Sequence, residues 1–304
     1  MTACATSSTP SRETSNDRPP LLEIDGLTVT FPTSRGPVDA VKGISFSLGR
    51  ERLGIVGESG SGKSMTGRAI LRLIRNPGRV TAKTMTFDGI DLLGRSERQM
   101  RDLRGARISM VMQDPKFSLN PVMTVGEQIA EALVTHRKLP RGELKARVLG
   151  MLEAVRIDDP ARVAGLYPHE VSGGMGQRVM IAMMLIPEPD LLIADEPTSA
   201  LDVSVQAQVL DIIDDLVTGK GMGLILISHD LNLVSRYCDR ILVMNSGEIV
   251  EACKASDLHD ARHPYTRGLL EAMPRMNETR EELPVLDRST WTTGGREHDR
   301  GHSS

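Results

Sequence analysis

The sequence predicts an α/β fold with a parallel sheet, one strand of which leads into a glycine-rich loop. An antiparallel β flank and a helical insertion complete the predicted fold. Three observations predict it. A short apolar strand at Leu53–Val56 leads into a glycine-rich loop and then into a helix. A strand–helix–strand unit follows, with apolar runs at Leu191–Ala194 and Leu224–Ile227, and such units have parallel strands. Between the glycine-rich loop and this strand–helix–strand unit, residues 124 to about 167 follow a helical pattern.

The composition excludes several classes of protein. Of 304 residues, 39% are hydrophobic and 25% are charged, as in a globular protein that dissolves in water. The net charge is −3 and aromatic residues make up only 3%, so no nucleic-acid ligand is expected. The longest notable apolar run, Val179–Ile186, is too short to span a bilayer, and the N-terminus lacks the apolar segment of a secretion signal. Cys4, Cys238 and Cys253 lack metal-ligand spacing, which predicts free thiols in a cytosolic protein.

The first ordered elements are predicted to be two strands. Residues 1–20 are rich in Ser, Thr, Asn and Pro and are expected to form a disordered tail. Apolar residues then alternate from Leu21 to Phe31, and a second alternating run follows the turn at residues 32–37. We expect these strands to form the antiparallel flank. Phe31 ends the first strand, where its ring either stacks on an adenine or packs in the core, and the pattern leaves both open.

The glycine-rich loop satisfies the pattern G-x-x-x-x-G-K-[ST] in full. Its residues are Gly57, Glu58, Ser59, Gly60, Ser61, Gly62, Lys63 and Ser64. Glycines allow successive N–H groups to point inward, and the helix that opens near Gly62 adds its dipole, so the loop can bind phosphate. Lys63 is expected to reach the β- and γ-phosphates, and the Ser64 hydroxyl to hold Mg²⁺. The sequence therefore predicts a nucleoside-triphosphate site.

The segment after the loop helix contains further strands and then helices. The turn Asp88-Gly89 predicts a hairpin edge, and Arg107–Met112 reads as a buried strand. Thr124 and Glu127 have the spacing of a capping box at the start of an amphipathic helix. We expect the helical insertion to cover about 114–178.

Two acidic residues end the strand Leu191–Ala194. A carboxylate at the tip of a buried strand beside a phosphate loop can hold Mg²⁺, which is the role expected of Asp195. The adjacent Glu196 can polarise the attacking water. A helix cap is the alternative, and Pro197 makes simple capping less favourable.

A second anion site is predicted at Ser172, Gly173 and Gly174, because these residues precede a helix and expose its first N–H groups. One chain seldom needs two such sites for one nucleotide. We therefore expect this one to bind the γ-phosphate held by a neighbouring subunit. An ordinary capped helix is the alternative for this segment taken alone.

His229 follows the strand Leu224–Ile227 and can hydrogen-bond a γ-phosphate oxygen. A lone His at a strand end is more often inert, but its place after the next strand beyond Asp195 and Glu196 favours function. A hairpin is predicted over Arg240–Glu251.

Six motifs together resemble those of ATP-binding cassette (ABC) ATPases, in the same order. They are Gly57–Ser64 (Walker A), Gln113 (Q-loop), Ser172-Gly173-Gly174 (signature), Asp195-Glu196 (Walker B), Ser199–Asp202 (D-loop) and His229 (H-loop). The resemblance covers about Leu21–Ala255 and implies a P-loop NTPase core of the RecA-like type with a helical subdomain. It also implies that Gln113 serves catalysis and Mg²⁺ binding, and that Asp202 contributes to nucleotide binding. Accordingly, we expect an ATPase domain over 21–255, then a C-terminal appendage and polar tail over 256–304.

More narrowly, the chain is similar to the ATPase subunits of bacterial peptide and nickel importers. The segments that carry this likeness are Gln113–Pro115, Ser118–Pro121, Tyr167–Glu170, Leu201–Gln208 and His263–Arg267. Three residues depart from the usual signature, namely Val171, Met175 and Gly176. Many relatives carry a cysteine-containing C-terminal extension, but residues 276–304 contain no cysteine.

The resemblance implies an ATP-hydrolysing subunit of an importer, with ATP and Mg²⁺ as ligands. Two such subunits, identical or paralogous, would close head to tail on two ATP molecules and drive separate membrane permeases on the cytoplasmic face of the bacterial inner membrane. An extracytoplasmic binding protein would be an indirect partner. Two rivals are a soluble ABC ATPase acting on nucleic acid or ribosomes and an inactive nucleotide-binding regulator. Intact Glu196 and His229 count against the second rival.

Overall fold

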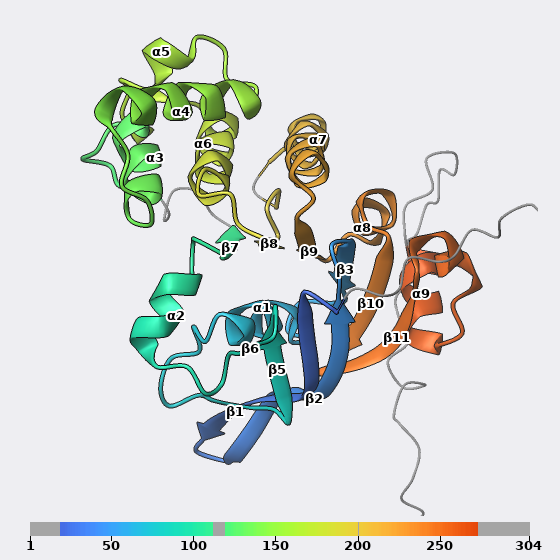
Figure 1. The fold of residues 1–304 in the computed structure, drawn as a ribbon. Coiled ribbons are helices and arrows are strands. Elements are labelled where there is room, and N and C mark those ends of the chain that lie inside the picture. Colours follow the sequence, from blue (N-terminus) through green and yellow to red (C-terminus); the bar gives the residue numbers. More distant parts are fainter. Residues whose placement is uncertain (1–18, 112–118, 200, 273–304) are drawn as a thin grey trace, which may run out of the picture.

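A six-stranded sheet lies at the centre of the computed structural model, which describes residues 19–111, 119–199 and 201–272 (Figure 1). Its order is β11-β10-β3-β9-β8-β7. Neighbours from β10 to β7 are parallel, and β11 pairs antiparallel with β10. The strands are β3 (Arg52–Val56), β7 (Ile108–Val111), β8 (Leu191–Asp195), β9 (Gly223–Ser228), β10 (Arg240–Asn245) and β11 (Glu248–Lys254). The predicted parallel sheet and hairpin are confirmed.

A second, antiparallel sheet flanks the first. It is built from β1 (Leu22–Thr33), β2 (Gly36–Leu48), β4 (Arg79–Thr81), β5 (Thr84–Phe87) and β6 (Ile90–Asp91). This confirms the predicted flank and the hairpin edge at Asp88-Gly89. One detail of the prediction is wrong: β1 continues past Phe31 to Thr33, and the turn is confined to Ser34 and Arg35, because the two strands pair as far as Thr33 and Gly36.

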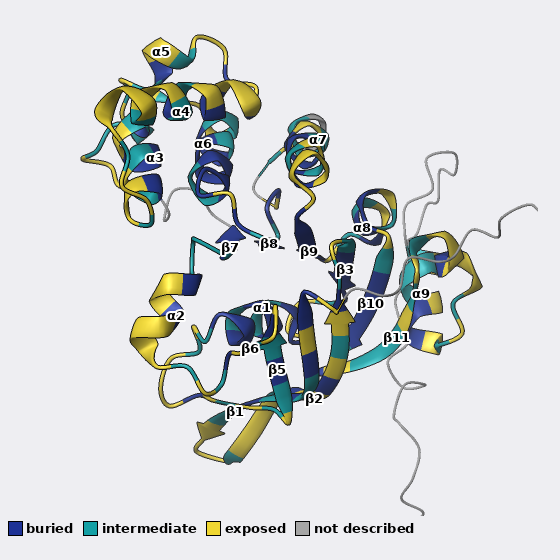
Figure 2. Cartoon of the chain, viewed as in Figure 1, coloured by how far each residue is buried: buried dark blue, intermediate teal, exposed yellow. Residues whose placement is uncertain are grey.

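Two hydrophobic cores lie on the two faces of the central sheet. Alternation along β9 shows this directly, since Ile225 and Ile227 pack in one core and Leu224 and Leu226 in the other. The first core also contains helix α1 (Lys63–Ile70) and the antiparallel sheet, whereas the second contains most of the remaining helices. Figure 2 shows the central strands buried along most of their length, as expected for parallel strands covered on both faces.

The helical insertion packs as a cluster. Its members are α3 (Val125–Val134), α4 (Arg141–Ala154), α5 (Pro160–Val163), the short 3₁₀ helix η2 (Pro168–Glu170) and α6 (Gly173–Leu185). The predicted capping box is present: the Thr124 N–H donates to Glu127 Oε2 at 2.8 Å, and the Glu127 N–H donates to Thr124 Oγ1 at 3.3 Å. In Figure 1 the cluster lies beside the sheet, and the chain returns from α6 to the sheet at β8.

The remaining helices are α2 (Glu97–Leu103), α7 (Val203–Lys220), α8 (Leu231–Tyr237), the 3₁₀ helix η3 (Ala255–Asp260) and α9 (Pro264–Ala272). The α7 helix joins β8 to β9, as predicted, and α9 forms the predicted helical appendage. Three elements were not predicted from the sequence, namely β4, α2 and α8. The predicted tail (but for residues 19 and 20), Gln113 and residues 273–304 lie outside the described ranges. The proposed domain boundaries stay predictions.

Candidate nucleotide-binding site

The glycine-rich loop connects β3 to α1 and requires glycine at specific positions. Gly60 and Gly62 have φ angles of 83° and 100°, in the region that side chains disfavour. A Cβ on Gly57 would lie 2.1 Å from the carbonyl oxygen of Met244 on β10. The loop therefore follows its path only because these three residues carry no side chain.

Lys63, the first residue of α1, is almost fully buried, with 5% of its surface exposed. Its ammonium donates to the carbonyl oxygens of Gly57 and Glu58, at 2.7 and 2.8 Å. Burial lowers the pKa of Lys63, whereas the nearby carboxylates of Glu196 and Asp195 act in the opposite direction. A buried ammonium held by two carbonyl oxygens at a helix N-terminus is well placed to bind an anion.

Ser64 and Asp195 bring two kinds of oxygen together. The Ser64 hydroxyl donates to Asp195 Oδ1 at 2.7 Å. Burial raises the pKa of Asp195, and the Ser64 hydrogen bond opposes this rise. Hydroxyl and carboxylate oxygens are ligands that Mg²⁺ prefers, alongside substrate phosphates and water. The described residues contain no cluster of three or more His, Cys, Asp or Glu that could hold a metal alone. The pair fits Mg²⁺ bound with the help of phosphate.

Glu196 and His229 meet at the ends of β8 and β9. His229 Nδ1 lies 3.2 Å from Glu196 Oε1. The backbone of Glu196 has a φ of 46°, and its N–H donates to the carbonyl of Ile227 at 2.9 Å. Left-handed backbone at a residue other than glycine is strained and is found preferentially at functional positions. The carboxylate that was predicted to polarise water is therefore held in an unusual backbone conformation.

One cavity of about 490 Å³ gathers most of these residues. It is lined by Phe31, Ala40, Ser59, Gly60, Gly62, Lys63, Ser64, Met65 and Glu196. Seven of these were predicted from the sequence. Ala40 and Met65 were missed: Met65 directly follows the loop motif and was recognisable on that ground, whereas nothing in the pattern of the second strand marks Ala40. The volume lies in the usual range for small-molecule sites.

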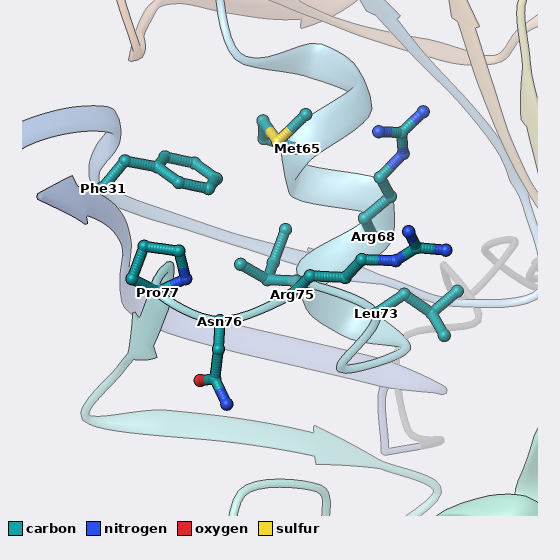
Figure 3. A pocket seen from close by; sticks show the side chains of 8 residues that line it. Phe31, Met65, Arg68, Leu73, Arg75, Asn76 and Pro77 are labelled. Atoms are coloured by element: carbon teal, nitrogen blue, oxygen red, sulfur yellow. The ribbon is translucent and has the colours of Figure 1, made fainter. Parts of the chain in front are cut away.

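A second cavity of about 650 Å³ adjoins the first, and the two share Phe31 and Met65. Figure 3 shows the Phe31 ring pointing from β1 toward α1, which carries Met65 and Arg68. Phe31 is partly buried and packs at the edge of the core around α1. Its ring thus both contacts the core and faces the candidate site, as adenine stacking requires.

Several predicted site residues lie elsewhere in the described structure and do not line the first cavity. Ser172 caps α6, since its Oγ accepts from the Met175 N–H at 3.3 Å, and Ser172 and Gly173 are exposed. Asp202 caps α7 by accepting from the Val205 N–H at 3.0 Å. Gln113 is outside the described residues. The structure of one chain therefore assembles the phosphate loop, Asp195, Glu196 and His229, but not the signature residues.

Comparison with known proteins agrees with this geometry. Residues 41–199 match the family model described as ABC transporter. The chain is 47% identical to the oligopeptide transport ATP-binding protein OppD of Bacillus subtilis over 86% of this chain and 74% of that one. It is also 47% identical to the dipeptide transport ATP-binding protein DppD of Escherichia coli, over 88% and 82% of the two chains.

Solved structures give the same result. A dimeric post-hydrolysis state of the ATP-binding cassette MJ0796, bound to ADP and Pi, matches with a TM-score of 0.69 and 26% identity. The match covers 77% of this chain and 98% of that one. CbiO1 of Clostridium perfringens, part of the ABC transporter complex cbiONQ, matches with a TM-score of 0.68 and 26% identity, over 79% and 91% of the two chains.

Both relatives are named as transport ATP-binding proteins, so they support the transport interpretation and not the rival in which the ATPase acts on nucleic acid. The fold is that of a P-loop NTPase cassette. The chain belongs to the ABC transporter family and is one of its ATPases.

Proposed function

We propose that this chain hydrolyses ATP to energise the uptake of peptides, or of a related small solute such as a metal chelate or an opine, through separate permease subunits. The observation that carries the proposal is the convergence of Lys63, Ser64 and Glu196 on one cavity. Lys63 and Ser64 begin helix α1 after β3, and Glu196 follows β8, which β9 separates from β3 in the sheet. The names of the relatives support peptides as the substrate class.

Different residues of the chain bind different parts of the ATP molecule. The loop N–H groups and Lys63 bind the β- and γ-phosphates, and Phe31 stacks against the adenine. Ser64 and Asp195 hold Mg²⁺, which neutralises charge on the phosphates when bound. Gln113 is expected to join this set. The Lys63 ammonium already lies within the loop, where the carbonyl oxygens of Gly57 and Glu58 accept two of its three N–H groups and the third can donate to a phosphate oxygen.

Hydrolysis depends on positioning a water molecule in line with the γ-phosphate. Glu196 is partly buried at the rim of the cavity, where its carboxylate can accept a proton from that water. His229 Nδ1 contacts the same carboxylate. We assign water activation to Glu196 and orientation of the carboxylate and phosphate to His229.

The site is completed by a second ATPase subunit, either another copy or a paralogue. Ser172, Gly173 and Gly174 lie at the exposed N-terminus of the 13-residue helix α6, and they bind the γ-phosphate held by the partner. Asp202 lies at the same interface. Dimeric cassette structures among the structural relatives support this arrangement.

The proposed location is the cytoplasmic face of the bacterial inner membrane, through contact with permease subunits. Within the described part of the chain, no helix combines the length and apolarity of a membrane span. A binding protein outside the membrane delivers substrate to the permeases and does not contact this chain.

Uptake in cells tests the proposal. The chromosomal gene is replaced by Glu196→Gln, and accumulation of a radiolabelled tripeptide and of nickel is compared with the parental strain. Loss of tripeptide uptake supports the full proposal, and selective loss of nickel uptake would replace peptide by metal chelate as the substrate. Parental uptake of both solutes, together with stimulation of the purified ATPase by nucleic acid, would overturn the importer assignment.

A further inference from the structure

The peptide group that joins Gly57 to Glu58 is hydrogen-bonded on both sides. Its carbonyl oxygen accepts from the Lys63 ammonium at 2.7 Å. Its N–H donates to the Tyr265 hydroxyl at 2.9 Å. Since the oxygen and the N–H of a trans peptide point in opposite directions, the two bonds together fix the plane of this peptide.

Tyr265 reaches the loop from the far end of the chain. It lies in α9, and 207 positions separate it from Glu58. The ring is fully buried, with 0% of its surface exposed. A buried tyrosine hydroxyl needs a polar partner, because desolvation without one is unfavourable. The loop N–H supplies that partner.

The turn before α9 is tied to the sheet that carries the loop. The carboxylate of Glu251 on β11 accepts from the Arg262 N–H at 2.7 Å and from the His263 N–H at 3.4 Å. The Tyr265 N–H donates to His263 Nδ1 at 3.2 Å. Strand β11 pairs with β10, which pairs with β3, the strand that feeds the loop. The tyrosine is thus held in a fixed place relative to the loop.

A separate contact holds the other end of the loop. The Gly247 N–H, in the turn between β10 and β11, donates to the carbonyl of Ser61 at 3.0 Å. This bond is made by the Ser61 carbonyl and does not involve the Gly57–Glu58 peptide. The Tyr265 hydroxyl accepts from the N–H of that peptide and so holds its other side.

We propose that Tyr265 is a positioning residue of the nucleotide site. By fixing the Gly57–Glu58 peptide, it aims the carbonyl oxygen that places the Lys63 ammonium between the phosphates. Helix α9 lies outside the matched family region 41–199, and through Tyr265 it then helps to position the ATP site. This inference rests on the proposed role of Lys63 as a phosphate ligand.

The test uses Tyr265→Phe in the full-length protein and measures equilibrium binding of ATP, ADP and AMP. Loss of one hydrogen bond is expected to weaken ATP and ADP binding about 2- to 10-fold. AMP binding is expected to be unchanged, because AMP lacks the β- and γ-phosphates that Lys63 contacts. A purely structural role would weaken all three nucleotides alike.

Tyr237→Phe is a matched control. Tyr237 is also buried, and its hydroxyl donates to Asp211 Oδ1 at 2.8 Å, away from the loop. Its removal is expected to leave the affinities for all three nucleotides at parental values. If Tyr265→Phe does not fold, Glu251→Ala loosens the turn before α9 and is expected to weaken ATP and ADP selectively.

The outcomes separate this inference from the function on which it rests. Failure of the parental protein to bind ATP would overturn the proposed function. Parental ATP and ADP affinity in folded Tyr265→Phe, or an equal loss for AMP, would overturn the positioning role alone.

Discussion

Ser64 and Asp195 are 131 positions apart in the sequence and are joined by a 2.7 Å hydrogen bond from the serine hydroxyl to the carboxylate. The bond links the first turn of α1 to the last residue of β8. It places two hard oxygen ligands at the edge of the cavity where phosphate is expected. The two oxygens that we propose as Mg²⁺ ligands therefore already lie side by side in the chain.

Asp195→Asn tests this pair. Burial raises the pKa of Asp195 in the folded protein, so the folded state holds this proton more tightly than the unfolded state does. This carboxylate therefore lowers stability as pH rises from the ordinary value of 3.8 through the raised pKa, and the cost persists at neutral pH. At pH 7 without nucleotide, Asp195→Asn is expected to melt at or above the parental temperature.

The same variant is expected to lose most of the thermal stabilisation that ATP with Mg²⁺ gives the parental protein, because the charged ligand is gone. Melting curves with and without EDTA provide the control. Parental stabilisation by ATP and Mg²⁺ in Asp195→Asn would show that the metal binds elsewhere.

Glu196→Gln is expected to bind ATP with parental affinity but to hydrolyse it at least about 100-fold more slowly, because the amide cannot accept the proton of the attacking water. Steady-state phosphate release and nucleotide binding are measured on the same preparation. Parental turnover in this variant would exclude Glu196 as the catalytic carboxylate.

Gly176→Ala is expected to stabilise the protein. Gly176 lies inside α6, and a Cβ there would meet only Leu119 Cδ1, at the ordinary contact distance of 3.8 Å. Alanine is favoured over glycine in a helix by about 1 kcal/mol. Urea denaturation should therefore show a gain of about 0.5–1 kcal/mol in the free energy of unfolding.

Gly54→Ala provides the opposite case, since its Cβ would lie 1.9 Å from Val234 Cγ1 in the core. This variant is expected to lose stability by about 1–3 kcal/mol. A loss in both variants would mean that α6 does not tolerate the added methyl group and that Gly176 has a packing role.

Cys238 and Cys253 are expected to react poorly with thiol reagents, and all three cysteines are expected to be dispensable for nucleotide binding. Burial raises the pKa of the Cys238 thiol to about 12, and burial also raises the pKa of Cys253. Between pH 7 and 9 Cys238 therefore stays protonated, so a thiol reagent should label it only after unfolding. The variant Cys4→Ser, Cys238→Ala, Cys253→Ser is expected to bind ATP normally. Rapid labelling of native Cys238, or a large loss of affinity in the folded variant, would contradict this.

Sequence patterns predicted most of the fold because the strands of the central sheet are short apolar runs next to recognisable turns. The missed helix α2 had a readable signal, since Ser96 and Gln99 form a capping box at its start. The missed β4 has only three residues, too few for alternation to be seen. Short edge elements depend on pairing with a partner strand more than on their own sequence.

The site was predictable where a motif keeps its residues close in the chain or at the tips of adjacent strands. The contact between Tyr265 and Glu58 was not, because local patterning does not say which distant N–H a buried hydroxyl will meet. The positive φ of Glu196 was likewise invisible, since nothing in the residue type marks a strained backbone.

The central claim is that each ATP is held between the phosphate loop of one subunit and the signature residues of another. Mixing two variants tests it most directly. Lys63→Ala is expected to abolish ATP binding in its own chain. Ser172→Arg is expected to leave ATP binding intact. Its bulky cation would occupy the position of the γ-phosphate and so prevent closure of the dimer. Each variant also carries Glu196→Gln to slow ATP turnover. If the partner subunit is a paralogue, one of the two changes is placed in this chain and the other in the paralogue.

ATP-dependent dimerisation is then measured by light scattering. A mixed dimer contains one intact site, made from the loop of the Ser172→Arg chain and the signature of the Lys63→Ala chain. The account predicts that the mixture regains part of the dimerisation that neither variant shows alone. ATP-dependent dimerisation of Ser172→Arg alone at the parental level would contradict it.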